Sequence, residues 1–333
     1  QDANVRATTQ PLYEGLVARG QNAWPSVRFD FGAINNLFGR FFAAGFYYKT
    51  FMGLPPFEWG RGTGMWMRYE KIIRKAAGMG TASREPDPDH YEHAHGYCDL
   101  LVVGSGPAGR ATALSAANAG CDVILVEQDA VLGGDSLNHP DSAAALQEEL
   151  AALASIGVRV MASTTAFGLY DYGVAGLLER VTDHLTDPPS WLPRQRFWTL
   201  RTRATVIAAG ALERHVAFGN NDRPGVMTAN AGRAYLNRFA IRSGESIVVA
   251  TNNDSAYITA SDLAGSGAHV TVLDSRGAIP QSLRSLCGTA DITVHLDSAP
   301  MQALGGNAVS GLSMACRQGN NWQAAGRREC DLV

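Results

Sequence analysis

A glycine-rich turn lies between an apolar run and an alanine-rich segment, and an acidic residue follows further along the chain. Residues 100–103 read Leu-Leu-Val-Val, residues 104–109 read Gly-Ser-Gly-Pro-Ala-Gly, and a second apolar run over 123–126 leads directly into Glu127. Short apolar runs on either side of a helix-forming segment predict a strand, a turn, a helix and a second strand. With the acid at the end of the second strand, this order is typical of a βαβ unit that binds a dinucleotide.

Each glycine of the turn has a separate physical role in such a unit. Gly104 permits the tight turn after the strand, Gly106 allows the backbone to approach a pyrophosphate, and Gly109 allows the helix to pack closely on the strand. The N-terminus of the helix then presents free N–H groups and a partial positive charge to the phosphates. Glu127 lies where a carboxylate accepts hydrogen bonds from the ribose, and together with Asp129 it would repel the 2′-phosphate of NADP.

Three later segments are expected to return to the bound dinucleotide. They are a paired-glycine loop over 132–136, a strand over 158–166 that ends beside the adenine, and a strand over 204–211 that ends in a small-residue turn. No catalytic residue is expected in this chain. The candidate cofactor-binding residues are Gly104, Gly106, Pro107, Ala108, Gly109, Glu127, Gln128, Asp129, Gly134, Asp135, Ser136, Ala166, Ala209 and Gly210.

The same unit is repeated later in the chain in a degenerate form. The shift in numbering that places Thr251 over the first glycine aligns the two segments without a gap. Asn253 then replaces the second glycine, Ala256 replaces the third, and Asp274 occupies the position of the acid. The second copy keeps the strand–helix–strand frame but lacks the two glycines that make room for phosphate. The predicted fold is therefore α/β, with two Rossmann-like dinucleotide-binding βαβ folds of the FAD/NAD(P)-binding, pyridine nucleotide-disulfide reductase type, the second of them degenerate.

Composition excludes several other classes of protein. The net charge of −3 offers no basic surface for nucleic acid or for anionic lipid. The five cysteines include no CxxC pair and are odd in number, which favours a reduced, cytoplasmic setting. The most apolar early stretch, 29–54, is interrupted by Asp30, Arg40 and Lys49, so neither a secretory signal nor a membrane span is expected.

The 333 residues suggest about two domains. We expect an N-terminal helical and aromatic linker region over 1–97, the intact dinucleotide-binding domain over 98–220, and the degenerate one over 221–333. The chain begins without methionine and ends in an apolar run that is typical of a strand, so the sequence is expected to be a piece of a longer polypeptide, truncated within the second domain.

The N-terminal region and the linker after it hold the remaining candidate features. Apolar residues recur with helical spacing from Ile34 to Phe42, and aromatic residues are concentrated over 46–69, where packing on the nucleotide fold is favoured over contact with a partner. A histidine-rich stretch before the first strand could suggest a metal site. It lacks a second ligand cluster, so a structural role is favoured and no metal is expected. The stretch contains His90, His93, His95 and Cys98.

Several stretches outside the nucleotide motifs indicate a family. They are Asn-Val-Arg-Ala-Thr-Thr at 4–9, Gln-Asn-Ala-Trp-Pro-Ser at 21–26, Ala-Gly-Phe-Tyr-Tyr-Lys-Thr-Phe-Met at 44–52, Asp-Pro-Asp-His-Tyr-Glu-His at 87–93, Asn-Asp-Arg-Pro-Gly-Val-Met at 221–227 and Thr-Asn-Asn-Asp-Ser-Ala-Tyr at 251–257. The chain resembles flavoproteins with two dinucleotide-binding domains, of the thioredoxin-reductase and glutathione-reductase type. Over nearly its whole length it is more similar to the alpha subunits of heterotetrameric sarcosine oxidases.

This resemblance implies a role within a cytoplasmic oxidase complex for sarcosine catabolism. The complex converts sarcosine, oxygen and tetrahydrofolate into glycine, methylenetetrahydrofolate and hydrogen peroxide. It implies NAD in the intact fold of this chain, FAD and FMN on a partner beta subunit, and further gamma and delta subunits. It also implies a small ferredoxin-like domain before this region and a folate-binding domain after it. The segment would then be a dinucleotide-binding scaffold, with the small-molecule substrate handled by the complex.

Three alternatives stay open on the sequence alone. FAD could replace NAD, because the same glycine fingerprint binds both. The chain could be the equivalent subunit of an opine oxidase, a hydrogen cyanide synthase or a dye-linked proline dehydrogenase. It could also be a non-catalytic scaffold whose nucleotide site is vestigial.

Overall fold

The computed structural model describes residues 24–26, 29–34, 37, 70–71, 73–74, 86–87, 89–185 and 187–333. The chain forms two compact units. One consists of Gln1–Ala94 and Leu178–Trp198, and the other consists of His95–Leu177 and Thr199–Val333.

The first βαβ unit forms as the glycine pattern predicts. β1 (Tyr91–Val103) leads into α3 (Pro107–Asn118), and β2 (Val123–Val126) pairs with β1 in parallel. α4 (Ala143–Ser155) then leads to β3 (Arg159–Met161), which pairs in parallel with β2. Parallel neighbours need a crossover connection, and the two helices provide it.

Three further strands complete the sheet and bring a distant segment to the glycine turn. β4 (Thr164–Tyr170), β5 (Val174–Arg180) and β6 (Gln195–Ile207) extend it to six strands in the order β3-β2-β1-β6-β5-β4. Immediately after β6, the N–H of Ala208 donates a hydrogen bond to the carbonyl oxygen of Val103 at 2.8 Å. The segment that follows β6 therefore starts beside the turn that follows β1.

The strand boundaries differ from the sequence expectation in two places. The single strand expected over 158–166 is divided between β3 and β4, because the chain turns at Ser163 in the left-handed region (φ 50°). The N–H of Ser163 donates to the carbonyl oxygen of Asp129 at 3.0 Å, so a contact with the loop after β2 fixes this turn. The strand expected over 204–211 is the last part of a longer strand, β6, which begins at Gln195 and ends at Ile207.

The sequence also failed to predict β5. Its residues include Gly176 in the middle of the strand, and glycine is disfavoured in strands. A Cβ on Gly176 would overlap the aromatic ring of Phe167 in the neighbouring strand β4. The ring of Phe167 therefore lies over the glycine and would have to move for any larger residue, and local sequence does not reveal that contact.

The second copy of the unit has the predicted frame. β7 (Ser246–Thr251), α6 (Ser255–Gly265) and β8 (His269–Asp274) follow one another, and α7 (Gln281–Thr289) leads to β9 (Thr293–His295). The strands pair in parallel in the order β7-β8-β9. The loss of two glycines has not changed the backbone plan.

An antiparallel sheet and one helix surround this second sheet. β10 (Ser298–Gly305), β11 (Val309–Gln318) and β12 (Asn321–Arg328) form the antiparallel sheet, and α5 (Ala229–Phe239) precedes β7 in the chain. After β12, Leu332 forms a parallel bridge with Ile247 of β7. The final apolar run expected to be a strand therefore has one bridging residue on the edge of the β7–β9 sheet.

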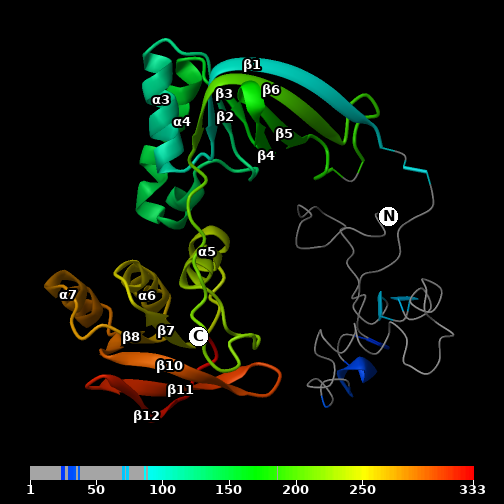
Figure 1. Ribbon diagram of the computed structural model, residues 1–333. Helices are drawn as coiled ribbons and strands as arrows, with labels where there is room; N and C mark the ends of the chain where they lie inside the picture. The colour runs from blue at the N-terminus through cyan, green and yellow to red at the C-terminus, as the bar shows by residue number, and fades with distance from the viewer. Residues whose placement is uncertain are drawn as a thin grey trace. The chain divides into compact units, whose positions relative to one another are not determined.

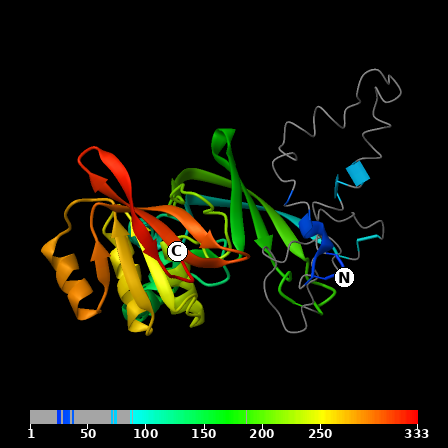
Figure 2. The same ribbon diagram turned by 90° about the horizontal axis from the view of Figure 1, so that it is seen from below.

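The second fold is built in three layers. Figure 1 shows α6 and α7 over one face of the β7–β9 sheet and β10–β12 over the other, and Figure 2 shows the same layers from below. Side chains alternate along β7 in keeping with this arrangement. Ile247 and Val249 pack with Tyr257 and Leu263 of α6, whereas Val248 packs in a separate cluster with Leu312 of β11.

Most N-terminal expectations concern residues that lie outside the described part of the chain. Of the apolar residues from Ile34 to Phe42, the structure describes Ile34, in a 3₁₀ turn over 31–34, and Leu37. The aromatic segment 46–69 is not among the described residues. Within the residues that are described, no helix has the length and apolar character required to cross a bilayer.

We predict that Gly109→Ala destabilises the fold whereas Gly106→Ala hardly affects it. A Cβ on Gly109 would overlap the carbonyl oxygen of Gly104, while a Cβ on Gly106 would meet no atom within 4 Å. Such overpacking costs about 1–3 kcal/mol of unfolding free energy, and alanine for glycine at an N-cap costs less than about 1 kcal/mol. Urea denaturation followed by circular dichroism measures both, and equal stabilities for the two variants would contradict the packing described for the turn.

Candidate functional site

The glycine turn after β1 is closely packed on one side and open on the other. Gly104 has a φ of +102°, and a Cβ there would overlap the carbonyl oxygen of Ala208. A Cβ on Gly109 would overlap the carbonyl oxygen of Gly104, so α3 touches the end of β1. A Cβ on Gly106, in contrast, would meet nothing within 4 Å. The open side of Gly106 is where a phosphate group can approach the backbone.

The first turn of α3 has no side chain of its own that caps it. Gly106 is the N-cap residue and Pro107 begins the helix, and the first turn contains no acidic residue. An uncapped helix N-terminus has unsatisfied N–H groups and a partial positive charge. The residues present therefore fit an anionic pyrophosphate at this position.

Glu127 is buried and already holds the turn in place. Its Oε2 accepts hydrogen bonds from the N–H of Ser105 at 2.9 Å and from Ser105 Oγ at 2.6 Å, and its Oε1 accepts one from the N–H of Asp129 at 3.1 Å. Burial by itself would raise the pKa of the Glu127 carboxyl, but the hydrogen bonds outweigh it and hold that pKa below its usual value. A carboxylate has about four acceptor positions, so Glu127 has acceptor capacity beyond the three hydrogen bonds given above.

The paired-glycine loop lies directly on the glycine turn. Gly133 and Gly134 have φ values of +138° and +54°, a conformation that favours glycine. A Cβ on Gly134 would lie 2.9 Å from the Cα of Gly106. The N–H of Gly133 also donates to Ser105 Oγ at 2.9 Å. The structure therefore brings the loop and the turn together at the expected phosphate position.

Arg110, which the sequence analysis did not single out, connects the same parts. It is buried, and its Nη1 donates to the carbonyl oxygens of Ser105 at 2.7 Å and Gly133 at 3.0 Å. Its Nη2 donates to Ser136 Oγ at 3.0 Å, and its Nε donates to Glu149 Oε2 on α4 at 2.6 Å. The available signal was an arginine immediately after the third glycine, on a helix face that packs against the sheet.

The remaining candidate residues differ in their surroundings. Asp135 is exposed and bound within its own loop, with Oδ1 accepting from Asn138 at 2.9 Å. Ala209 borders the turn, since its Cα would lie 3.3 Å from a Cβ on Gly104. Four other candidates are exposed or half-buried, so a ligand can reach them. These are Ala108, Gln128, Ala166 and Gly210.

The loop after Gly134 is also held by α5. Asn237 Nδ2 donates to the carbonyl oxygen of Asn138 at 2.7 Å. The two terminal nitrogens of Arg233 lie 3.2 and 3.1 Å from the ring nitrogens of His139, and its Nε donates to Asp262 Oδ2 at 2.7 Å. Side chains from α5 and α6 therefore support the loop on which the candidate phosphate site depends.

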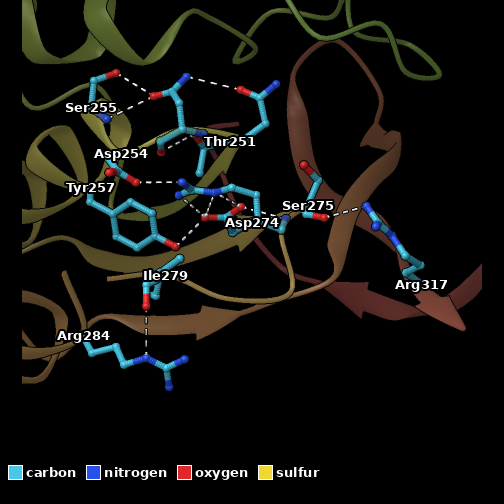
Figure 3. Close-up of polar contacts among 12 residues, drawn as sticks. Thr251, Asp254, Ser255, Tyr257, Asp274, Ser275, Ile279, Arg284 and Arg317 are labelled. Atoms are coloured by element: carbon cyan, nitrogen blue, oxygen red, sulfur yellow. Dashed lines mark hydrogen bonds and ion pairs between the residues drawn. The ribbon is translucent and has the colours of Figure 1, made fainter. Parts of the chain in front are cut away.

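The corresponding turn in the second fold carries polar side chains where the intact turn has glycines. Figure 3 shows Thr251 and Ser255 beside the start of α6. Asn253 Oδ1 accepts hydrogen bonds from the N–H of Ser255 at 3.0 Å and from Ser255 Oγ at 2.7 Å. Thr251 Oγ1 accepts from the N–H of Asn253 at 3.1 Å. A carboxamide therefore takes the hydrogen bonds that a phosphate would take at the intact turn.

The acid of the second fold is likewise engaged. Asp274 is fully buried, and Arg276 donates to its Oδ1 from the backbone N–H at 2.9 Å and to its Oδ2 from Nη2 at 2.8 Å. Tyr257 donates to Oδ2 at 2.8 Å, as Figure 3 shows. Burial would raise the pKa of Asp274, but these partners hold it below its usual value, and burial together with the same contact raises the pKa of Tyr257. Arg276 also pairs with Asp254, so the ribose position is occupied by an ion-pair network.

Most of the histidine-rich stretch lies in a strand and not in a linker, and His90 directly precedes that strand. β1 begins at Tyr91, so His93 and His95 lie on one face of the strand and the buried Cys98 lies on the other. Alternation therefore separates these candidate ligands. Within the described residues no three histidine, cysteine or acidic side chains come together as a metal site.

Sequence comparison relates this chain to oxidoreductase subunits. The family model of FAD dependent oxidoreductases matches residues 99–162, which contain the glycine turn and Glu127. The alpha subunit of sarcosine oxidase from Rhizobium meliloti (strain 1021) is 46% identical over 288 residues, which cover 83% of this chain and 28% of that protein. An opine oxidase subunit of Agrobacterium tumefaciens (strain Ach5) is 28% identical over 203 residues, which cover 55% of this chain and 39% of that protein. The chain thus spans less than half the length of each of these relatives.

Structural comparison agrees with the fold described above. The crystal structure of thioredoxin reductase from T. acidophilum superposes with a TM-score of 0.54 at 14% sequence identity, covering 71% of this chain and 75% of that one. At this identity the likeness concerns the fold alone. The chain is therefore a homologue of sarcosine oxidase alpha subunits, built on the α/β fold of thioredoxin reductases.

Proposed function

We propose that this chain is the dinucleotide-binding part of the alpha subunit of an amine-oxidising complex of the sarcosine oxidase type. The observation that carries the proposal is the open side of Gly106 at the uncapped start of α3, next to the buried carboxylate of Glu127. The similarity to the alpha subunit of sarcosine oxidase supports the choice of complex. The partners are then beta, gamma and delta subunits, and the setting is cytoplasmic.

NAD is the proposed ligand of the first fold, with FAD as the alternative. Gly106 and Gly134 leave the backbone accessible to the pyrophosphate, and Glu127 Oε1 accepts a hydrogen bond from the ribose. Glu127 and Asp129 place negative charge beside the ribose, which disfavours the additional phosphate of NADP. When bound, such a cofactor supplies redox chemistry, and the residues named here bind and orient it.

The second fold is proposed to bind no dinucleotide. Asn253 Oδ1 accepts the N–H of Ser255 at the start of α6, and Arg276 donates hydrogen bonds to the acid of that fold, Asp274. A cavity of about 550 Å³ does lie at this turn, beside β7, with lining residues that include Thr251, Asn253 and Ala256. Its lining contains no phosphate-binding glycine turn, so it does not favour a second pyrophosphate.

An opine-oxidising complex is the second candidate, because the opine oxidase subunit is also a relative. Its identity to this chain is lower and covers less of the chain than that of the sarcosine oxidase alpha subunit. Activity assays of the assembled complex with sarcosine and with an opine decide between the two substrates. Release of nucleotide from the purified protein by acid, followed by chromatography, decides between NAD, FAD and a vestigial site.

We predict that Gly106→Val abolishes dinucleotide binding but leaves the protein folded. The valine side chain would occupy the open space beside the turn, where the protein itself places no atom within 4 Å. Calorimetric titration with NAD and a thermal melt measure the two properties. A folded Gly106→Val protein with unchanged affinity would place the ligand elsewhere.

We predict that Glu127→Ala weakens NAD binding by about 1–3 kcal/mol through the lost ribose hydrogen bond. Because Glu127 also holds Ser105, the variant loses stability as well. The folded pKa of Glu127 is depressed, so its contribution is present above the unfolded pKa and is lost as pH falls through the folded pKa. The difference in unfolding free energy between Glu127→Ala and the parent protein should therefore become smaller as pH falls through the folded pKa of Glu127.

The matched control for Glu127→Ala is Asp122→Asn, which changes an exposed acid just before β2. Its NAD affinity is expected to equal that of the parent protein. A Glu127→Ala protein that binds NAD as tightly as the Asp122→Asn protein would mean that the carboxylate serves the turn alone.

We predict that this chain alone does not oxidise sarcosine, even when it is loaded with NAD. Amine oxidation needs a redox centre placed beside the substrate carbon, and the proposed flavins belong to the partner beta subunit. Hydrogen peroxide is measured with sarcosine and oxygen, with and without the partner subunits. Peroxide produced by the chain alone would overturn the scaffold role.

A further inference from the structure

Arg110 is a buried cation with its hydrogen bonds directed at two separate loops. Four of its N–H groups are used, by the carbonyl oxygens of Ser105 and Gly133, by Ser136 Oγ and by Glu149 Oε2, over distances of 2.6 to 3.0 Å. The side chain of Arg110 is only 3% exposed. A buried arginine with this many partners is held in one position, because moving it would leave several polar groups unsatisfied.

The two loops that Arg110 joins are those that frame the open side of Gly106. Ser105 belongs to the glycine turn, and Gly133 and Ser136 belong to the loop that lies on it. A Cβ on Gly134 would lie only 2.9 Å from Gly106 Cα, so the loops touch beside the opening. The guanidinium group of Arg110 therefore bridges the backbone of the turn and the backbone of the loop, in addition to the hydrogen bond from Gly133 N–H to Ser105 Oγ.

The charge of Arg110 also favours an anion at this position. Its ion-pair partner, Glu149, lies on α4 with a side chain that is 44% exposed, so solvent screens the carboxylate more than the guanidinium. The arginine lies in the first turn of α3, where the helix already carries a partial positive charge.

Glu127 holds the same turn independently of Arg110. It binds the N–H and the hydroxyl of Ser105, whereas Arg110 binds the carbonyl oxygen of Ser105. Loss of Arg110 therefore removes three of the hydrogen bonds that hold the 133–136 loop and the turn, and it leaves the bond from Gly133 N–H to Ser105 Oγ and the bonds from Ser105 to Glu127.

We propose that Arg110 is the positioning residue of the dinucleotide site, which it shapes by fixing the 133–136 loop against the glycine turn at the spacing a pyrophosphate requires. It acts through backbone groups and does not itself touch the ligand. The inference rests on the proposed function, because it assumes that the first fold binds a dinucleotide.

The test uses the full chain, together with any subunits that co-purify with it, after bound nucleotide has been removed. ADP-ribose and adenosine serve as probes, because only ADP-ribose contains the pyrophosphate. For Arg110→Met we expect the Kd of ADP-ribose to rise about tenfold or more and the Kd of adenosine to stay unchanged. Arg110→Lys keeps the charge but cannot bridge four acceptors, so it is expected to restore only part of the affinity.

Two further variants keep the test decisive. Arg276→Met removes another ion-paired arginine, in the second fold, and should leave the Kd of ADP-ribose unchanged. Ser136→Ala removes only the acceptor of Arg110 Nη2 and should raise that Kd by a few-fold, even if Arg110→Met does not fold.

The outcomes separate this inference from the proposed function. If the parent protein binds neither ADP-ribose nor NAD nor FAD, the proposed function fails. If the parent binds ADP-ribose and both Arg110→Met and Ser136→Ala bind it equally well, the positioning role alone is wrong. Equal losses for ADP-ribose and adenosine would also overturn it, because they would indicate a general loss of structure.

Discussion

The close approach of α3 to the end of β1 is the constraint on which the first fold depends. Gly109 lies against the carbonyl oxygen of Gly104, and only the absence of a Cβ permits that approach. It sets where α3 begins, so the uncapped N-terminus lies directly beyond the strand. This contact also fixes where Ser105 and Arg110 lie, and it leaves one side of Gly106 open.

The two folds show how one backbone plan yields different sites. Both place a helix N-terminus and an acid at the ends of two parallel strands. In the second fold, Asn253 Oδ1 accepts a hydrogen bond from the N–H of Ser255, and Arg276 donates one to the carboxylate of Asp274. Asn253, which replaces one of the glycines, thus satisfies an N–H at the start of α6, and Arg276 pairs with the acid that would bind a ribose, so both positions have side-chain partners in the degenerate fold.

The degenerate fold nevertheless contributes to the intact one. The loop over Gly134 is held on one side by Arg110 and on the other by residues of α5. Asn237 binds the carbonyl oxygen of Asn138, and Arg233 joins His139 to Asp262. Side chains of the second fold therefore hold the loop on which the candidate phosphate site depends.

The sequence by itself determined both strand–helix–strand units and the acids that end them, because glycine geometry and apolar alternation act over a few residues. It did not reveal β5, whose Gly176 makes room for the ring of Phe167. It also did not reveal that Glu127 binds Ser105 or that Arg110 joins two loops. Those features were decided by the tertiary structure, since each needs groups from segments that meet only after the strands have paired.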